Sequence, residues 1–140
     1  MSATKGQLTP RDLLLIEFCL NHLPITSDIA AVLFYPNKYI AQRRLTTIHQ
    51  LKQLKRSERL IMNQPYCYYK NKSDLKNIIF SQLLYDLTLH DYKIEQYTFE
   101  ENTLTAIVHQ SSNSFQINAT RNNLQQVYHR LSLNEKVANV

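Results

Sequence analysis

The sequence predicts a mixed α+β fold, with helices in the first half of the chain and strands mainly in the second. From residue 10 to residue 55, apolar residues recur at three- and four-residue steps, the spacing of helices that bury one face. Short strand-like segments follow at 60–69, and apolar residues alternate roughly with polar ones at 93–118. A length of 140 residues is typical of one domain, or of one domain with an appendage.

The first helix is expected to begin after Thr9, a residue type that caps helix N-termini well. Pro10 takes the first helical position, where its missing N–H costs nothing, and Asp12 lies in the first turn, where the helix dipole favours an acid. The helix is predicted to end between Asn21 and Pro24. Its buried face is predicted to consist of Leu13, Ile16, Leu20 and Leu23.

A second helix is predicted from Thr26 or Ser27, either of which can cap it, to Phe34. Pro36 ends this helix because the residue before a proline avoids the helical region. A third helix is predicted over about residues 37–55. The inward-facing residues of the second helix are expected to be Ile29, Val32 and Leu33.

A β-hairpin is predicted after the third helix. Its strands are expected at 60–62 and 66–69, with the turn at 64–65, because the second strand is rich in the aromatic residues that strands favour. Tyr69 is expected to point outward. The two tyrosines expected to pack on the core are Tyr66 and Tyr68.

The second half of the chain predicts a long fourth helix, capped by Ser73 or Asp74 and extending to about Leu89. Strands are expected at 93–99, 103–110 and 114–118, and a last helix at 122–131 after a cap at Thr120. We therefore expect two domains, residues 8–72 and residues 73–140. The second is expected to serve dimerisation or the binding of a partner.

Three helices followed by a two-stranded hairpin are typical of the winged helix-turn-helix, whose third helix enters the major groove of DNA. The predicted architecture is thus a winged helix-turn-helix followed by a long helix and a small strand-rich C-terminal segment. At about 100° per residue, one side of the third helix carries the core residues Ala41, Leu45, Ile48 and Leu51. The opposite side has no acid and carries residues suited to base edges: Tyr39, Gln42, Arg43, Thr46, Gln50 and Gln53.

Positive charge is concentrated around this helix. The chain has a formal charge of +5, and the only acid between residues 37 and 59 is Glu58. Such a concentration indicates binding to a polyanion, although a solvated basic helix face remains the alternative. The basic residues expected at the DNA-binding surface, mainly as phosphate contacts, are Lys38, Lys52, Lys55, Arg56, Arg59, Lys70 and Lys72.

Arg44, unlike the other basic residues of the third helix, lies on its apolar side. A guanidinium at the edge of a core is more suited to a fixed ion pair than to reading a base. Its predicted partner is Asp12, Glu17 or Asp28.

The sequence argues against catalysis and against a metal or cofactor. Cys19 and Cys67 lie far apart, and the five histidines form neither a His-x-His pair nor a cluster with acids. The single glycine, Gly6, excludes the Gly-rich loops of nucleotide-binding folds. The longest apolar run, Ile29–Tyr35, has seven residues, whereas a membrane helix needs roughly 20. We expect a cytoplasmic protein that is no enzyme and has no membrane partner.

The chain contains, in this order, the motifs Leu8-Thr9-Pro10-Arg11-Asp12, Ile25–Ala30, Leu33–Pro36, Arg43-Arg44-Leu45, Pro65–Tyr69 and Leu87–Asp91. Together they resemble the replication-relaxation family, winged-helix DNA-binding proteins of plasmids and other mobile elements in Gram-positive bacteria. The resemblance covers roughly residues 8–92.

This resemblance implies a sequence-specific binder of double-stranded DNA that serves as an accessory protein of plasmid transfer, in the relaxosome of conjugation, or of replication. A relaxase or a replication protein is then a further partner. Two alternatives remain open at this point, a winged-helix transcriptional regulator and a protein-interaction module. Most sequence-specific readers of this kind are two-fold dimers, so we also expect a homodimer.

Overall fold

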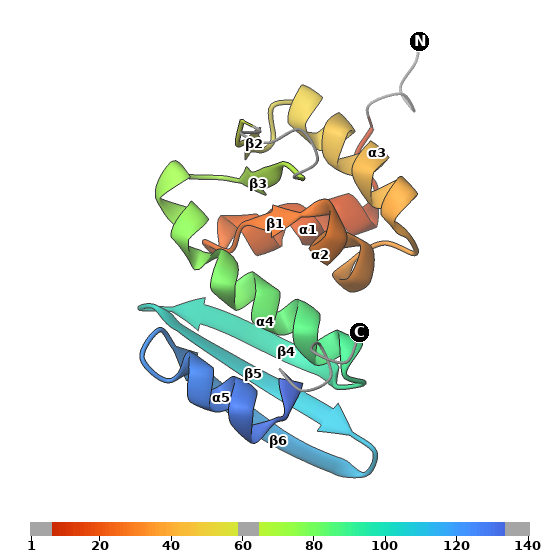
Figure 1. Ribbon diagram of the computed structural model, residues 1–140. Helices are drawn as coiled ribbons and strands as arrows, with labels where there is room; N and C mark the ends of the chain where they lie inside the picture. The colour runs from red at the N-terminus through yellow and green to blue at the C-terminus, as the bar shows by residue number, and fades with distance from the viewer. Residues whose placement is uncertain (1–6, 59–64, 134–140) are drawn as a thin grey trace. The chain divides into compact units, whose positions relative to one another are not determined.

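The computed structural model describes residues 7–58 and 65–133 and confirms the mixed α+β class (Figure 1). The chain divides into two compact units, one up to Ser81 and the other from Gln82 onward. This division lies within helix α4 (Ile78–Leu89), whereas the sequence places the domain boundary between residues 72 and 73. No helix in the described segments has the length and apolar character needed to cross a membrane.

The helices of the first unit begin where the sequence predicts. They are α1 (Pro10–Leu20), α2 (Ser27–Leu33) and α3 (Lys38–Gln50). The side chains of Thr9, Thr26 and Asn37 each accept a hydrogen bond from the backbone N–H three positions further on, so each helix has an N-cap. The Asp12 carboxylate accepts a hydrogen bond from the Thr9 N–H in return, which completes a capping box.

A small antiparallel sheet accompanies these helices. Its strands, in the spatial order β1-β3-β2, are β1 (Ile25–Thr26), β3 (Cys67–Tyr69) and β2 (Lys55–Arg56). The predicted strand at 66–69 is thus observed one residue shorter. The predicted strand at 60–62 and the turn residue Gln64 lie outside the described residues.

The predicted buried face of α1 is wrong in part. Leu13 and Leu20 are 54% and 51% exposed, and Leu23, although buried, follows the helix. The face that is buried consists of Asp12, Leu15, Ile16, Phe18 and Cys19. The observed buried face is turned relative to the predicted one because it includes the carboxylate of Asp12. Apolar periodicity alone assigns carboxylates to the solvent.

The predicted end of α3 is also wrong, because the helix stops at Gln50 and not near Lys55. Lys52 adopts a positive φ of 62°, and the Gln53 N–H donates to the Ile48 carbonyl at 3.1 Å. This is the hydrogen-bond pattern of a helix C-terminus that normally uses glycine. The reversal turns the chain so that Leu54 is buried in place of Leu51, which is 37% exposed.

The prediction that Tyr69 points outward is wrong, since Tyr68 and Tyr69 are 4% and 8% exposed. Both residues lie on β3, which is the central strand of its sheet and pairs on both sides. A central strand can be covered on both faces, so alternation along it does not separate core from solvent. Tyr66 is half-buried and contacts the Tyr68 ring edge-on, at 6.3 Å between centroids.

A buried carboxylate connects all three helices of the first unit. Asp12 of α1 is fully buried, and the hydroxyl of Tyr35, which follows α2, donates to it at 2.6 Å. Arg44 of α3 donates to it through Nε at 3.2 Å and through Nη2 at 2.5 Å. Of the three partners predicted for Arg44, the structure therefore confirms Asp12.

The protonation states in this cluster follow from burial and pairing. Burial alone would raise the pKa of Asp12, but hydrogen bonds from Arg44, the Thr9 N–H and Tyr35 together hold the pKa below its ordinary value of 3.8. Burial, followed by the hydrogen bond to Asp12, raises the pKa of Tyr35. The cluster is therefore a carboxylate held by a neutral phenol and a guanidinium.

The link from the first unit to α4 differs from the prediction. Residues Lys72–Asn77 form a 3₁₀ helix, η1, which Asn71 precedes without a side-chain cap bond. Neither Ser73 nor Asp74 caps α4. Asp74 is instead buried and lies 3.1 Å from His22 Nδ1, so its carboxylate serves a tertiary contact.

The second unit is a three-stranded antiparallel sheet with the order β4-β5-β6. Its strands are β4 (Lys93–Glu100), β5 (Thr103–Gln110) and β6 (Asn113–Thr120), and helix α5 (Leu124–Arg130) follows. The predicted strands are confirmed, with small changes at their ends. Helix α5 begins later than expected because Asn123 takes the N-cap position, and Thr120 accepts a hydrogen bond from the Asn123 N–H.

One face of this sheet is covered and the other is open. Leu104, Val108 and Ile117 are buried, and the hydroxyl of Tyr128 on α5 donates to Asp86 on α4. The opposite face carries exposed polar side chains, among them Gln96, Thr98, Gln116 and Asn118. This unit therefore buries its core on one side of the sheet.

We predict that Asp12→Asn lowers the free energy of unfolding at neutral pH by about 2 kcal/mol, less than for a fully buried pair because Arg44 is 20% exposed. A carboxylate whose pKa is lowered by folding contributes stability that is fully present above its ordinary pKa of 3.8 and lost as pH falls through the lowered value. Urea unfolding across pH should therefore show a shallower acid loss in Asp12→Asn than in the wild type. Exposed Glu58, changed to Gln, is the control, and an equal effect there would contradict the prediction.

Candidate nucleic-acid interface

Helix α3 separates buried from exposed residues as the sequence predicts, except at its end. Ala41, Leu45 and Ile48 are completely buried. On the opposite side Tyr39 is 67% exposed, Gln42, Arg43 and Gln50 are exposed, and Thr46 is half-buried. The side chains suited to base edges therefore lie outside the core of this unit.

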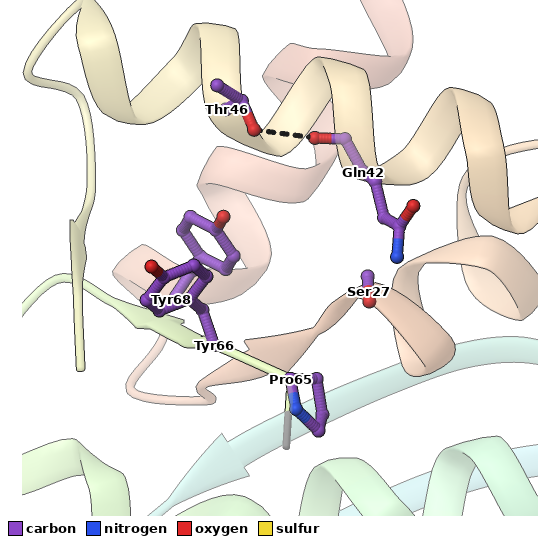
Figure 2. A pocket seen from close by; sticks show the side chains of 6 residues that line it. All are labelled: Ser27, Gln42, Thr46, Pro65, Tyr66 and Tyr68. Atoms are coloured by element: carbon purple, nitrogen blue, oxygen red, sulfur yellow. Dashed lines mark hydrogen bonds between the residues drawn. The ribbon is translucent and has the colours of Figure 1, made fainter. Parts of the chain in front are cut away.

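A polar pocket of about 260 Å³ lies beside α3. Figure 2 shows the side-chain amide of Gln42 directed toward Ser27 at the start of α2, with Tyr66 and Tyr68 on the other side. The residues that line it are Ser27, Gln42, Thr46, Pro65, Tyr66 and Tyr68. Amide, hydroxyl and aromatic groups from α3, from the start of α2 and from β3 with the residues before it therefore surround one pocket.

A second, shallower hollow of about 370 Å³ runs along α3 itself. It is lined by Tyr39, Gln42, Arg43, Thr46 and Thr47. Gln42 and Thr46 line both hollows, so they lie at the centre of the candidate surface.

The hydroxyl protons of the two threonines on this surface are already committed. Thr46 Oγ1 donates to the Gln42 carbonyl at 2.9 Å (Figure 2), and Thr47 Oγ1 donates to the Arg43 carbonyl at 3.1 Å. Thr46 can therefore offer its lone pairs and its methyl group, but not its proton, to a base or phosphate.

Two arginines lie over tyrosine rings. The guanidinium carbon of Arg43 is 5.5 Å from the ring centre of Tyr39, and that of Arg56 is 4.1 Å from the ring centre of Tyr66. A guanidinium over the face of a tyrosine ring gains a cation–π attraction. Each of these two arginines therefore has an aromatic partner on this surface.

The remaining predicted residues differ in their surroundings. Lys55 lies opposite Tyr69 in the sheet, Lys70 directly follows the end of β3, and both lysines are exposed. Lys38 forms an exposed ion pair with Asp28 at 2.9 Å, so its charge is partly compensated. Gln50, Lys52, Gln53 and Lys72 are exposed, and Gln53 donates to the Leu51 carbonyl at 3.3 Å. Arg59 lies outside the described residues.

Sequence reasoning missed Ser27 and Tyr66 as members of this surface. Ser27 was expected only as a possible helix cap, and Tyr66 as a core residue. Tyr66 has an exposed neighbour in Pro65 and a half-buried one in Cys67, so alternation along the segment does not separate a core role from a surface role. For Ser27 the sequence offers no signal, because its position depends on how α2 meets α3.

The described residues offer no metal site on this surface. Among residues 7–58 and 65–133, no three His, Cys, Asp or Glu side chains gather as metal ligands do. Burial raises the pKa of Cys67 on β3 to about 11, so its thiol stays protonated and weakly nucleophilic. The chemistry that the surface can perform is hydrogen bonding, stacking and charge pairing.

We predict that Gln42→Ala and Gln50→Ala each change the free energy of unfolding by less than about 0.5 kcal/mol, because both side chains are exposed. Leu45→Ala, on the opposite side of the same helix, should cost about 3 kcal/mol. Urea unfolding monitored by circular dichroism measures all three. A loss at Gln42 or Gln50 comparable with that at Leu45 would mean that the amides hold the fold together instead of facing a ligand.

Comparison of the chain with protein-family models, with curated proteins and with solved structures finds no match. The resemblance to the replication-relaxation family therefore stays a prediction from the sequence. Any proposal about function therefore depends on the residues and geometry of the surface formed by α3 and the pocket beside it.

Proposed function

We propose that the first unit is a winged helix-turn-helix that binds double-stranded DNA, with α3 as the recognition helix in the major groove. The observation that carries this proposal is the exposed side of α3, which offers amides, a guanidinium and a hydroxyl and bears no acid. A solvated surface helix usually mixes acids with bases at four-residue spacing, and α3 does not.

The arrangement of elements supports the proposal. Helices α2 and α3 are joined only by residues 34–37, as the two helices of a helix-turn-helix are, and β2 and β3 form an antiparallel pair after α3, where a wing has its strands. An α-helix with its side chains is about 10–12 Å across, which fits the major groove of about 12 Å. In this proposal Gln42 and Gln50 read adenine, Arg43 reads guanine, and the methyl of Thr46 contacts a thymine.

The basic residues outside α3 take the phosphate contacts. Lys55 lies on β2, Lys70 directly follows the end of β3, and Arg56 lies over the Tyr66 ring. Such contacts supply affinity that does not depend on sequence and falls with salt. The polar pocket, lined by Gln42 and Thr46 of α3 and by Tyr68 of β3, then lies between the base-reading helix and the phosphate-binding strands.

For the biological process we propose plasmid transfer or replication, as the resemblance of the sequence implies. A transcriptional regulator would use the same surface, so the two differ only in where the recognition site lies. Selection of bound duplexes from a random pool, followed by location of the selected sequence near a transfer or replication origin or near a promoter, separates them. A homodimer would select two half-sites.

The test of DNA binding itself is an electrophoretic shift assay with the full chain at low salt. Binding to duplex DNA that weakens linearly in log–log form as salt rises is the expected result. No binding at low salt would reject the proposal and leave the basic surface as a solubility feature.

We predict that Arg43→Ala weakens binding to the selected sequence by about 10–100-fold, because a bidentate contact to guanine is worth roughly 1–3 kcal/mol. Binding to unrelated duplexes should change much less. Titration of both duplexes by fluorescence anisotropy checks this. Equal losses on both would show that Arg43 contacts phosphate and not a base.

We predict that Lys55→Ala weakens binding to selected and unrelated duplexes alike and lowers the slope of log affinity against log salt by about one. Lys93→Ala is the matched control, since Lys93 is an exposed lysine of the second unit. It should change neither affinity nor slope. A preferential loss on the selected duplex with Lys55→Ala would contradict its role as a phosphate contact.

A further inference from the structure

The two outer strands of the second sheet differ in how they are protected. Strand β4 is irregular, with a shift of register between Ile94 and Gln96, and it carries the charged residues Lys93, Glu95 and Glu100. Bulges and charges are the features by which proteins prevent an edge strand from pairing with another chain. The β4 edge is therefore protected.

Strand β6 has none of these features. It pairs with β5 in continuous register over its whole length, from Asn113 to Thr120, and it contains no charged residue and no proline. Figure 1 shows β6 at the outer side of the sheet, and within the described residues no strand pairs with its free side. An uncharged, regular edge of this kind is a template for another strand.

The backbone groups that face outward can be identified. The Asn118 carbonyl accepts from Asn123 Nδ2 at 3.0 Å, and the Thr120 N–H donates to Asn123 Oδ1 at 2.7 Å. Both groups therefore point away from β5, and because backbone direction alternates along a strand, so do those of Ser114 and Gln116. Asn123 covers the C-terminal end of the edge, which leaves the stretch from Ser114 to Asn118 for pairing.

We propose that β6 pairs antiparallel with β6 of a second copy of this chain, about a two-fold axis at Gln116, to form one continuous six-stranded sheet. Gln116 then lies opposite the partner subunit's Gln116, and Ser114 opposite the partner subunit's Asn118. The Gln116 pair can exchange two backbone hydrogen bonds, because outward-facing residues are the ones brought into register. The Asn118 N–H can donate to the partner subunit's Ser114 carbonyl, whereas the Asn118 carbonyl already accepts from Asn123 Nδ2. The proposal does not rest on DNA binding by the first unit.

Two features favour a second copy of this chain as the partner of the free β6 edge: the side chains of β6 and the closure of the resulting assembly. No like charges meet across the axis, because β6 has no charged residue. Phe115, which is half-buried and contacts Tyr92 at 5.9 Å, would gain the partner subunit's Ile117 beside it. Once two β6 strands have paired, the free edges of the joined sheet are both β4, which are protected, so growth stops at a closed dimer.

The first test removes the central hydrogen bonds. The full chain should sediment as a dimer, and Gln116→Pro should weaken the dimer at least tenfold, because the N–H that it removes points away from β5 and belongs to the pairing between copies. A proline is tolerated at such an edge position, and circular dichroism verifies that the variant is folded. A wild-type chain that stays monomeric at all concentrations, or a folded Gln116→Pro that dimerises as well as wild type, overturns the proposal.

The second test uses charge and does not depend on proline. Gln116→Lys and Gln116→Glu should each weaken the dimer, because identical charges then face each other across the axis, and an equal mixture of the two should restore it as a heterodimer. Gln96→Lys is the matched control: Gln96 lies opposite Ile107, which lies opposite Gln116, so the same charge is placed on the same face but at the β4 edge. Dissociation by Gln96→Lys, or no recovery in the mixture, also overturns the proposal.

Discussion

The first unit depends on one buried carboxylate. Asp12 caps the helix in which it lies, accepts the hydroxyl proton of Tyr35 beyond the end of α2, and binds the guanidinium of Arg44 on α3. A buried charge is costly unless it is paired and fully hydrogen-bonded, and this one is. Because every partner comes from a different segment, the carboxylate is satisfied in a single arrangement of the three helices. The orientation of α3, and with it the exposed row of polar side chains, follows from that arrangement.

The network also explains why Arg43 and Arg44 have different roles although they are neighbours. On a helix, consecutive residues lie about 100° apart, so a rotation that seats Arg44 on Asp12 turns Arg43 outward over the Tyr39 ring. A rotation of about 100° that brought Arg43 to Asp12 instead would turn the buried Ala41, Leu45 and Ile48 away from the core. The ion pair and the apolar face together therefore determine which guanidinium is structural and which is exposed.

Much of the fold could be predicted from the sequence because local rules and tertiary structure agree. Thr9, Thr26 and Asn37 cap the helices, the C-terminal strands alternate, and the partner of Arg44 was among three named acids. The errors in the prediction arise where the local rules and the tertiary structure disagree. Lys52 adopts a positive φ of 62° after α3, in a chain whose single glycine is Gly6, so the usual sequence mark of this helix end is missing. The buried face of α1 begins at an acid, and the polar pocket draws Ser27 and Tyr66 from elements that only the tertiary structure brings together.

The two units carry opposite net charges. Residues 1–81 contain twelve Lys and Arg and five Asp and Glu, a balance of +7, whereas residues 82–140 contain four and six, a balance of −2. A polyanion is attracted to the first unit and repelled by the second. The second unit instead offers an uncharged strand edge, at which backbone hydrogen bonds and not charge would determine the proposed pairing. The proposed binding of DNA and the proposed pairing of copies can therefore be tested separately, because they use surfaces on different units and depend on different physical forces.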